Sequence, residues 1–133
     1  MTKNYKLPYS KFNGYDIGVI VIPSNSMATL RFTSDAAYEN IILVSKNPNS
    51  RIIHVANNKT PNGLNNFIIK NPYNCPMSVF VSGWHLNPGS TNFVQNSMKK
   101  FVTNENNYSY GFEDSIDGDF NDIIVNIKIK TLC

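Results

Sequence analysis

Short runs of β-branched and aromatic residues recur along the chain, and clusters of Pro, Gly, Asn and Ser separate them. Residues 122–130 show the pattern most clearly, because apolar and polar side chains alternate there with the period of two that a half-buried strand requires. The apolar positions of this run are Ile123, Val125, Ile127 and Ile129. Similar runs occupy residues 16–22, 27–33, 39–45, 51–55, 66–70, 77–82 and 108–112. No longer window carries the apolar period of a helix.

Strands that recur about every 8–12 residues, with turn residues between them, predict an all-β fold. We expect an antiparallel β-sandwich of about nine short strands. No repeat, low-complexity linker or change of composition divides the chain, so residues 1–133 are predicted to form a single domain. Short apolar runs at 93–94 and 101–103 are harder to classify, and segment 95–100 between them is compatible with a helical turn.

Composition narrows the class of protein. The chain has 133 residues, of which 41% are apolar and 16% charged, and its net charge is +3. Lys99 and Lys100 are the only adjacent basic pair, so nucleic acid is not an expected partner. No stretch approaches the roughly 18 apolar residues of a membrane helix, and no signal peptide precedes the first strand. The location stays open: cytoplasmic synthesis is compatible with export to the cell surface by a route that needs no signal peptide.

The acidic residues are concentrated in residues 111–122. Five of the nine acids of the chain lie there: Glu113, Asp114, Asp117, Asp119 and Asp122. Their mutual repulsion needs an offset, and a hard cation with oxygen ligands, such as Ca²⁺, is the obvious one. The spacing of Asp117, Asp119 and Asn121 by two residues places their side chains on one side of an extended backbone.

Two other interpretations of this segment were weighed. An EF-hand loop that began at Asp117 would have Lys128 at position twelve, where a bidentate Glu is required, and no Gly at position six, so an EF-hand is excluded. An ordinary solvated turn is the second alternative, because Asp, Asn and Gly all favour turns. The concentration of charge favours the metal site over the turn.

Residues 113–122 read Glu-Asp-Ser-Ile-Asp-Gly-Asp-Phe-Asn-Asp and lead into a β-branched strand. This segment resembles the signature Glu-Asp-x-x-Asp-x-Asp-Tyr-Asn-Asp of the calcium-dependent fucose/mannose-binding lectins of bacteria, the Pseudomonas PA-IIL-like family. The resemblance implies a non-enzymatic lectin with two neighbouring Ca²⁺ ions that coordinate two sugar hydroxyls directly. Phe120 stands where the family has Tyr.

The resemblance assigns roles by position. The implied metal ligands are Glu113, Asp117, Asp119, Asn121 and Asp122. The implied sugar-binding residues in the same segment are Asp114, Asp117, Asp119 and Asp122. Four of the carboxylates, those of Glu113, Asp117, Asp119 and Asp122, would balance two divalent ions.

A second, looser match lies upstream, in residues 22–37. It places Asp35 at a metal ligand that coordinates through its main-chain oxygen. It places Ala36, Ala37 and Tyr38 in the loop that selects the sugar, without the hydroxyl-bearing residues of the family. In the family the final carboxylate enters the calcium site of a partner subunit. The corresponding position here is Leu132, with Cys133 beyond it, so a homo-oligomer is expected.

The remaining candidate residues are interpreted as structural. His54 lies in an apolar run and His85 beside Trp84, and no His/Cys spacing suggests zinc. Trp84, Tyr108 and Tyr110 are expected in the core or at an interface rather than against a sugar. The two Asn-x-Ser/Thr sequons, at Asn58 and Asn107, are attributed to chance in an Asn-rich chain.

Two functions therefore remain. The first is a calcium-dependent lectin for fucose- or mannose-type glycans, and it is not an enzyme. The alternative is a structural or adhesive β-module in which Ca²⁺ only braces the acidic loop.

Overall fold

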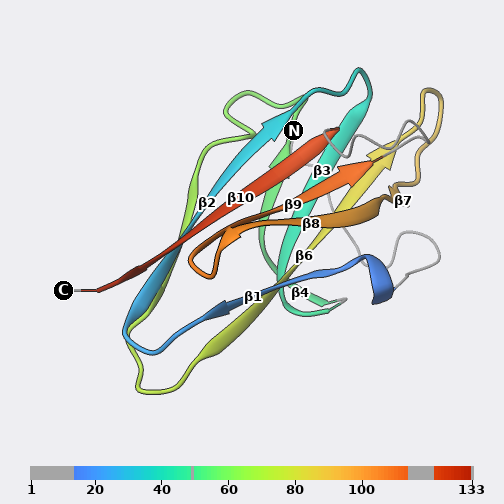
Figure 1. Cartoon of the computed structure of the whole chain (residues 1–133). Coiled ribbons are helices and arrows are strands. Elements are labelled where there is room, and N and C mark those ends of the chain that lie inside the picture. Colours follow the sequence, from blue (N-terminus) through green and yellow to red (C-terminus); the bar gives the residue numbers. More distant parts are fainter. Residues whose placement is uncertain (1–13, 49, 114–121, 133) are drawn as a thin grey trace.

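The computed structural model describes residues 14–48, 50–113 and 122–132, and nearly all of their regular structure is β (Figure 1). Within these residues there is one short 3-10 turn, η1 (Gly14–Asp16), and no α-helix. The strands are β1 (Gly18–Ile22), β2 (Ser26–Ser34), β3 (Glu39–Asn47), β4 (Ser50–Asn57), β5 (Phe67–Asn71), β6 (Met77–Leu86), β7 (Val94–Gln95), β8 (Ser97–Asn104), β9 (Asn107–Glu113) and β10 (Ile123–Thr131). The all-β prediction is confirmed. No helix among these residues is long and apolar enough to cross a membrane.

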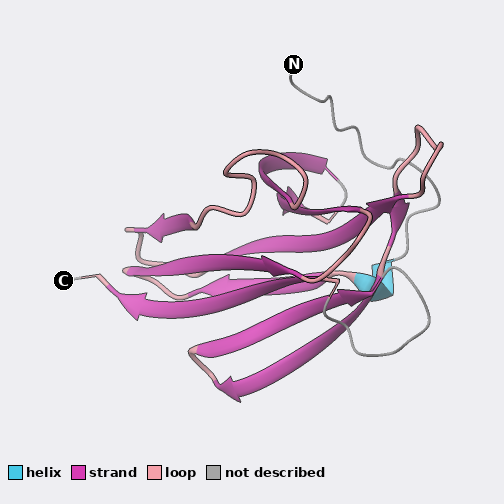
Figure 2. Ribbon diagram, turned by 90° about the horizontal axis from the view of Figure 1, so that it is seen from above, coloured by secondary structure: helices cyan, strands magenta, loops and turns pink. Residues whose placement is uncertain are grey.

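The strands form two antiparallel five-stranded sheets. Sheet A has the order β1-β6-β3-β4, and β7 pairs with β6 at Trp84 and His85, beyond the part of β6 that pairs with β1. Sheet B has the order β5-β2-β10-β9-β8. The strands run along the length of the molecule, with η1 at one end and the last described residues of the chain at the other (Figure 2). The two sheets make a single β-sandwich-like domain.

The main core lies between the sheets and follows the alternation seen in the sequence. In β10, Ile123, Val125 and Ile127 are buried, whereas Asn126 and Lys128 are exposed. Sheet A contributes Ile20, Ile22, Ile42, Val44, Ala56, Val79 and Val81, and sheet B contributes Ala28, Leu30, Phe32, Ile69, Tyr110, Phe112 and the three residues of β10. Burying such side chains, at about 25 cal/mol per Å² of apolar surface, is the main favourable contribution to folding.

A second apolar cluster contains Ile41, Leu43, Trp84 and Phe93, and it lies on the other face of sheet A. Because both faces of β3 are covered, this strand is a continuous apolar run without alternation. Trp84 is fully buried and its indole N–H donates to Ser82 Oγ over 2.9 Å. The expectation that Trp84 packs in a core is confirmed.

Tyr110 joins the two sheets. Its ring is buried in the main core, and its hydroxyl donates to the carbonyl of Val19 over 2.7 Å and accepts from the N–H of the same residue over 3.2 Å. The hydroxyl therefore satisfies the open edge of β1, which pairs with another strand only on the β6 side. A Cβ on Gly18 would lie 2.8 Å from the Tyr110 ring, so this close approach requires glycine.

Segment 95–100 is extended, so a helical turn there is wrong. Gln95 pairs with Trp84, and residues from Ser97 onward pair with β9. The buried Asn96 separates β7 from β8, and its N–H donates to the carbonyl of Gly83 over 2.8 Å. Pairing with β6 and β9 over these residues supplies hydrogen bonds that a single helical turn could not match, and neither partner is visible in the local sequence.

His54 has the structural role that was expected of it. Its ring stacks on Phe67, with 4.2 Å between the ring centroids, and on Phe32, with 5.5 Å between them. Its Nε2 is buried, and no described residue forms a hydrogen bond with it. Burial therefore lowers the pKa of His54 from its ordinary value of 6.5.

Acid should destabilise the fold through His54. Below pH 6.5 the unfolded chain binds a proton at this residue more readily than the folded chain does, so the free energy of unfolding falls as the pH falls. Replacing His54 with Phe keeps a stacking ring and removes the titration. Urea denaturation between pH 7.5 and pH 5 should show a smaller loss of stability for His54→Phe than for the wild type, and equal losses would refute the assignment.

Candidate metal and sugar site

The structure brings together three of the predicted metal ligands. Asp35 follows β2, Glu113 ends β9, and Asp122 directly precedes β10, so all three lie at one end of three neighbouring strands of sheet B. The other predicted residues of the acidic segment, Asp114, Asp117, Asp119 and Asn121, lie outside the described residues. The segment leaves and re-enters the sheet at neighbouring positions, because Phe112 pairs with Ile123.

The contact between β2 and β10 fixes Asp35 beside Asp122. Ser34 pairs with Ile123 at the end of the ladder. The main-chain carbonyl of Asp122 then accepts two hydrogen bonds, one from Ser34 Oγ over 2.5 Å and one from the N–H of Asp35 over 3.2 Å. The upstream match and the acidic segment, about 80 residues apart in the sequence, therefore meet in space.

Glu113 and Asp122 are unusually buried for carboxylates, with 4% and 8% of their surface exposed. They flank the Phe112–Ile123 pair, and Glu113 also pairs with Ser97 of β8. Burying ionised carboxylates side by side is costly unless a cation or several donors compensate for the lost hydration. Carboxylate and main-chain oxygens are ligands that Ca²⁺ prefers over a softer ion.

The connection from β2 to β3 carries the predicted sugar-selecting residues across from sheet B to sheet A. Ala37 and Tyr38 are exposed, Tyr38 to 47% of its surface, and Ala36 is half-buried. Because Asp35 is held against Asp122, this connection lies next to the end of the acidic segment. The two Ala side chains offer only apolar contact, so the Tyr38 hydroxyl is the one side-chain hydrogen-bonding group at positions 36–38.

Asn58 braces this connection, a role that the sequence did not predict. Its Nδ2 donates to the carbonyl of Tyr38 over 2.9 Å and to Ser34 Oγ over 3.2 Å, and its Oδ1 accepts from the N–H of Asn40 over 2.8 Å. One amide thus holds both ends of the connection. Both functional atoms of the Asn58 amide are engaged in these hydrogen bonds.

Behind Asn58 lies a buried chain of polar side chains. Asn96 Nδ2 donates to Asn40 Oδ1 over 2.9 Å, and His85 Nδ1 lies 2.5 Å from Asn96 Oδ1. With the Asn96 amide in that orientation, Nδ1 of His85 carries the proton. His85 is therefore structural, as predicted. Sequence reasoning missed this chain because Asn residues fill many of the loops, and only the pairing of β3 with β6 brings Asn40 opposite His85.

Among the described residues, no group of three or more His, Cys, Asp or Glu side chains is arranged to hold a metal ion by itself. A complete calcium site would therefore need oxygens from the acidic segment between Glu113 and Asp122. The described part of the chain contains the two strands that flank that segment, β9 before it and β10 after it.

Comparison with known proteins identifies the fold. No protein-family model matches the chain, and no curated protein matches it either. Solved structures do match. They include the C-terminal domain of the BC2L-C lectin from Burkholderia cenocepacia (18% identity, 83% of this chain and 92% of that one, TM-score 0.56), the Chromobacterium violaceum lectin CV2L in complex with alpha-methyl-fucoside (17%, 83% and 93%, 0.59) and a high-affinity mannose-binding lectin of Ralstonia solanacearum (18%, 83% and 93%, 0.55).

These three structures are bacterial lectins, and at such low identity the likeness shows the fold. The chain is similar to them over most of its length and over nearly all of theirs. The resemblance inferred from the acidic motif is confirmed at this level.

Replacing Asn58 with Ala should destabilise the protein by about 1–3 kcal/mol, because it removes an amide whose partners in the β2–β3 connection are partly buried. Asn65→Ala is a matched control, since Asn65 is an exposed residue in the following loop. Urea denaturation of both variants measures the difference. Equal stabilities would show that Asn58 is not a brace.

Proposed function

We propose that this protein is a calcium-dependent, non-enzymatic carbohydrate-binding protein. One observation carries the proposal: Asp35, Glu113 and Asp122 lie at one end of sheet B, next to an acidic segment, on a fold similar to that of bacterial lectins. Five acids within residues 113–122 concentrate negative charge in this segment, which favours a bound cation.

Some residues of the site would bind the metal ions, and some would bind the sugar. Glu113, Asp117, Asp119, Asn121 and Asp122 would hold two Ca²⁺ ions, with the main-chain oxygen of Asp35. When bound, Ca²⁺ offers coordination positions to two neighbouring sugar hydroxyls. Asp114, Asp117, Asp119 and Asp122 would accept hydrogen bonds from those hydroxyls, which fixes the orientation of the sugar.

The β2–β3 connection would contact the sugar beside the metal. Ala36 and Ala37 cannot form side-chain hydrogen bonds, so they would contact the apolar parts of the ring, such as the methyl group of a fucose-type sugar. Tyr38 would add an exposed aromatic face and one hydroxyl. Fucose- and mannose-type glycans, which the similar lectins bind according to their descriptions, are the first ligands to test.

The far end of β10 supports a homo-oligomer. The strand begins at the site with Ile123 and ends at Thr131, and the N–H of Leu132 donates to the carbonyl of Asn25 over 2.9 Å. Nine extended residues span about 30 Å, so Leu132 lies far from the Glu113–Asp122 end of its own sheet. A group close to Leu132 could therefore reach only the calcium site of a second copy, as the family resemblance implies.

One observation favours the alternative in which calcium only braces the loop. The carbonyl of Asp122 already accepts hydrogen bonds from Ser34 and Asp35, so this end of the sheet has a structural role without any sugar. The two functions differ in what they predict for added monosaccharide.

A thermal melt separates the two functions. Ca²⁺ at a hundredfold excess over its Kd should add about 2.7 kcal/mol to the stability measured in EDTA, because it binds the folded chain only. For a lectin, methyl fucoside or methyl mannoside should raise the melting temperature further in Ca²⁺ and have no effect in EDTA. A calcium effect without a sugar effect would establish the bracing role, and an unchanged melt on adding Ca²⁺ would exclude both functions.

Charge-neutral variants test the ligands themselves. Asp122→Asn and Glu113→Gln should each weaken Ca²⁺ binding at least about tenfold in calorimetric titration, because each removes a carboxylate from a low-dielectric site. Glu105→Gln is the matched control, since Glu105 is exposed in the turn between β8 and β9. A variant pair that bound Ca²⁺ as tightly as the control would rule out these two residues as ligands.

A further inference from the structure

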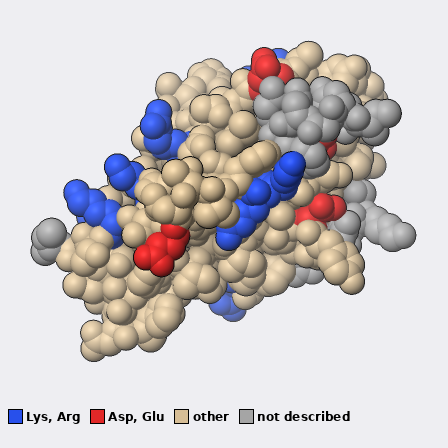
Figure 3. Space-filling view, in the orientation of Figure 1, with Lys and Arg blue, Asp and Glu red and all other residues tan. Residues whose placement is uncertain are grey.

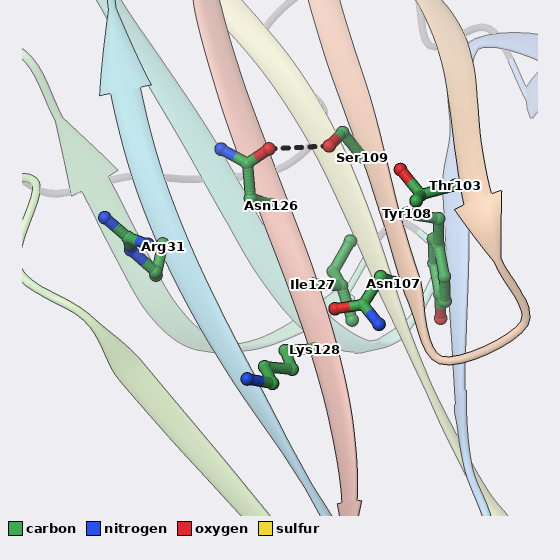
Figure 4. Close-up of a pocket in the computed structure, with 8 residues that line it drawn as sticks. All are labelled: Arg31, Thr103, Asn107, Tyr108, Ser109, Asn126, Ile127 and Lys128. Carbon is green, nitrogen blue, oxygen red and sulfur yellow. Dashed lines mark hydrogen bonds between the residues drawn. The ribbon is translucent and has the colours of Figure 1, made fainter.

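The outer face of sheet B, turned away from the main core, has a polar hollow of about 300 Å³ (Figure 4). Four neighbouring strands contribute to it. The hydrogen-bonding and charged side chains that line it are those of Arg31 from β2, Asn126 and Lys128 from β10, Asn107 and Ser109 from β9, and Thr103 from β8. Tyr108 and Ile127 complete the lining. This hollow is separate from the acidic site, because these residues lie along the strands rather than at the Glu113–Asp122 end.

The register of the sheet explains why these side chains meet. Asn126 is opposite Arg31 on one side and Ser109 on the other, and Lys128 is opposite Asn107. Ser109 Oγ donates to Asn126 Oδ1 over 2.6 Å, and Figure 4 shows the amide nitrogen of Asn126 on the side of Arg31. Amide and hydroxyl side chains therefore form the floor of the hollow, and the basic side chains of Arg31 and Lys128 lie at its sides.

Basic side chains recur along this face. Arg31 and Lys128 are exposed, and neither forms an ion pair with another described residue. Lys130 and Lys70 both pair with Met27 in the next row of the same face, so they extend the positive charge toward the far end of β10. On the face seen in Figure 3 the basic side chains form separate groups, and acidic side chains lie between and beside them.

The balance of charge in the whole chain agrees with a cationic surface. Outside the acidic segment, twelve Lys and Arg residues face only four acids. Four of the twelve cations lie on the outer face of sheet B: Arg31, Lys70, Lys128 and Lys130. Exposed cations without acidic partners attract polyanions over roughly a Debye length, about 8 Å at physiological salt.

We propose that this outer face is a second, calcium-independent binding site, for an anionic polysaccharide that carries sulfate or carboxylate groups. Arg31 and Lys128 bind the anionic groups, and the side chains of Asn107, Ser109, Thr103 and Asn126 hydrogen-bond the sugar hydroxyls between them. Amides and hydroxyls are the groups that match sugar hydroxyls. Tyr108 is the one aromatic residue among those that line the hollow, so the lining lacks the series of aromatic side chains on which the bases of a single-stranded nucleic acid would stack. A second copy of this chain is disfavoured, because a symmetric contact would oppose cations to cations.

Heparin affinity in EDTA tests this proposal independently of the calcium site. The protein should bind immobilised heparin at 0.1 M NaCl and be displaced by dextran sulfate but not by neutral dextran. The double variant Arg31→Gln/Lys128→Gln should bind about tenfold more weakly, from two exposed charge contacts. The control Lys46→Gln/Lys59→Gln removes the same charge from exposed positions outside sheet B and should bind like the wild type.

Asn126→Asp provides a second, conservative variant. It keeps an acceptor for Ser109 Oγ and places a negative charge in the floor of the hollow, so it should also weaken heparin binding while the melting temperature stays unchanged. Three results would overturn the proposal: no heparin binding in EDTA, equal weakening in the double variant and its control, or stronger displacement by a single-stranded oligonucleotide than by dextran sulfate. Loss of calcium-dependent sugar binding with heparin binding intact would refute only the proposed lectin function.

Discussion

The placement of β10 between β2 and β9 is the constraint on which the rest of this structure depends. Its ladder with β2 covers nine residue pairs, and its ladder with β9 covers six. Backbone hydrogen bonds set the register, and the buried alternation of Ile123, Val125 and Ile127 prevents a slip by one residue, which would turn these side chains to solvent. The same register brings Asp35, Glu113 and Asp122 to one end of the sheet and gathers Arg31, Asn126 and Ser109 on its outer face.

Buried polar groups then hold the parts that strand pairing leaves free. Asn58 fixes the connection between the sheets, and the Asn40–Asn96–His85 chain lies behind it. Tyr110 holds β1, the edge strand of sheet A, because its hydroxyl donates a hydrogen bond to the main chain of that strand. Such groups stabilise only when all their partners are in place, so they favour one arrangement of the β2–β3 connection over others.

Charge is separated along sheet B. Carboxylates gather at one end of the sheet and cations on its outer face, so the modest net charge says little about either surface. The two proposed ligands differ in chemistry accordingly: a divalent cation with its sugar at the end of the strands, and a polyanion on the face. The acidic residues are neighbours in the sequence and can be recognised there as a motif. The residues of the basic face come from four strands and are brought together only by the fold.

The sequence by itself determined the fold class, the β10 alternation and the acidic segment, because strand period and local concentration of charge are properties of neighbouring residues. It also assigned Trp84, His54 and His85 to structural roles, which the structure confirms. The extended conformation of segment 95–100 could not be predicted from the local sequence, because its strand pairing depends on partners in β6 and β9. Only the tertiary structure placed Asp35 against Asp122, made Asn58 a brace and lined up Arg31 with Lys128 on one face. Each of these depends on the register of strands that are distant in the sequence, and register is set by the packing of the whole sandwich.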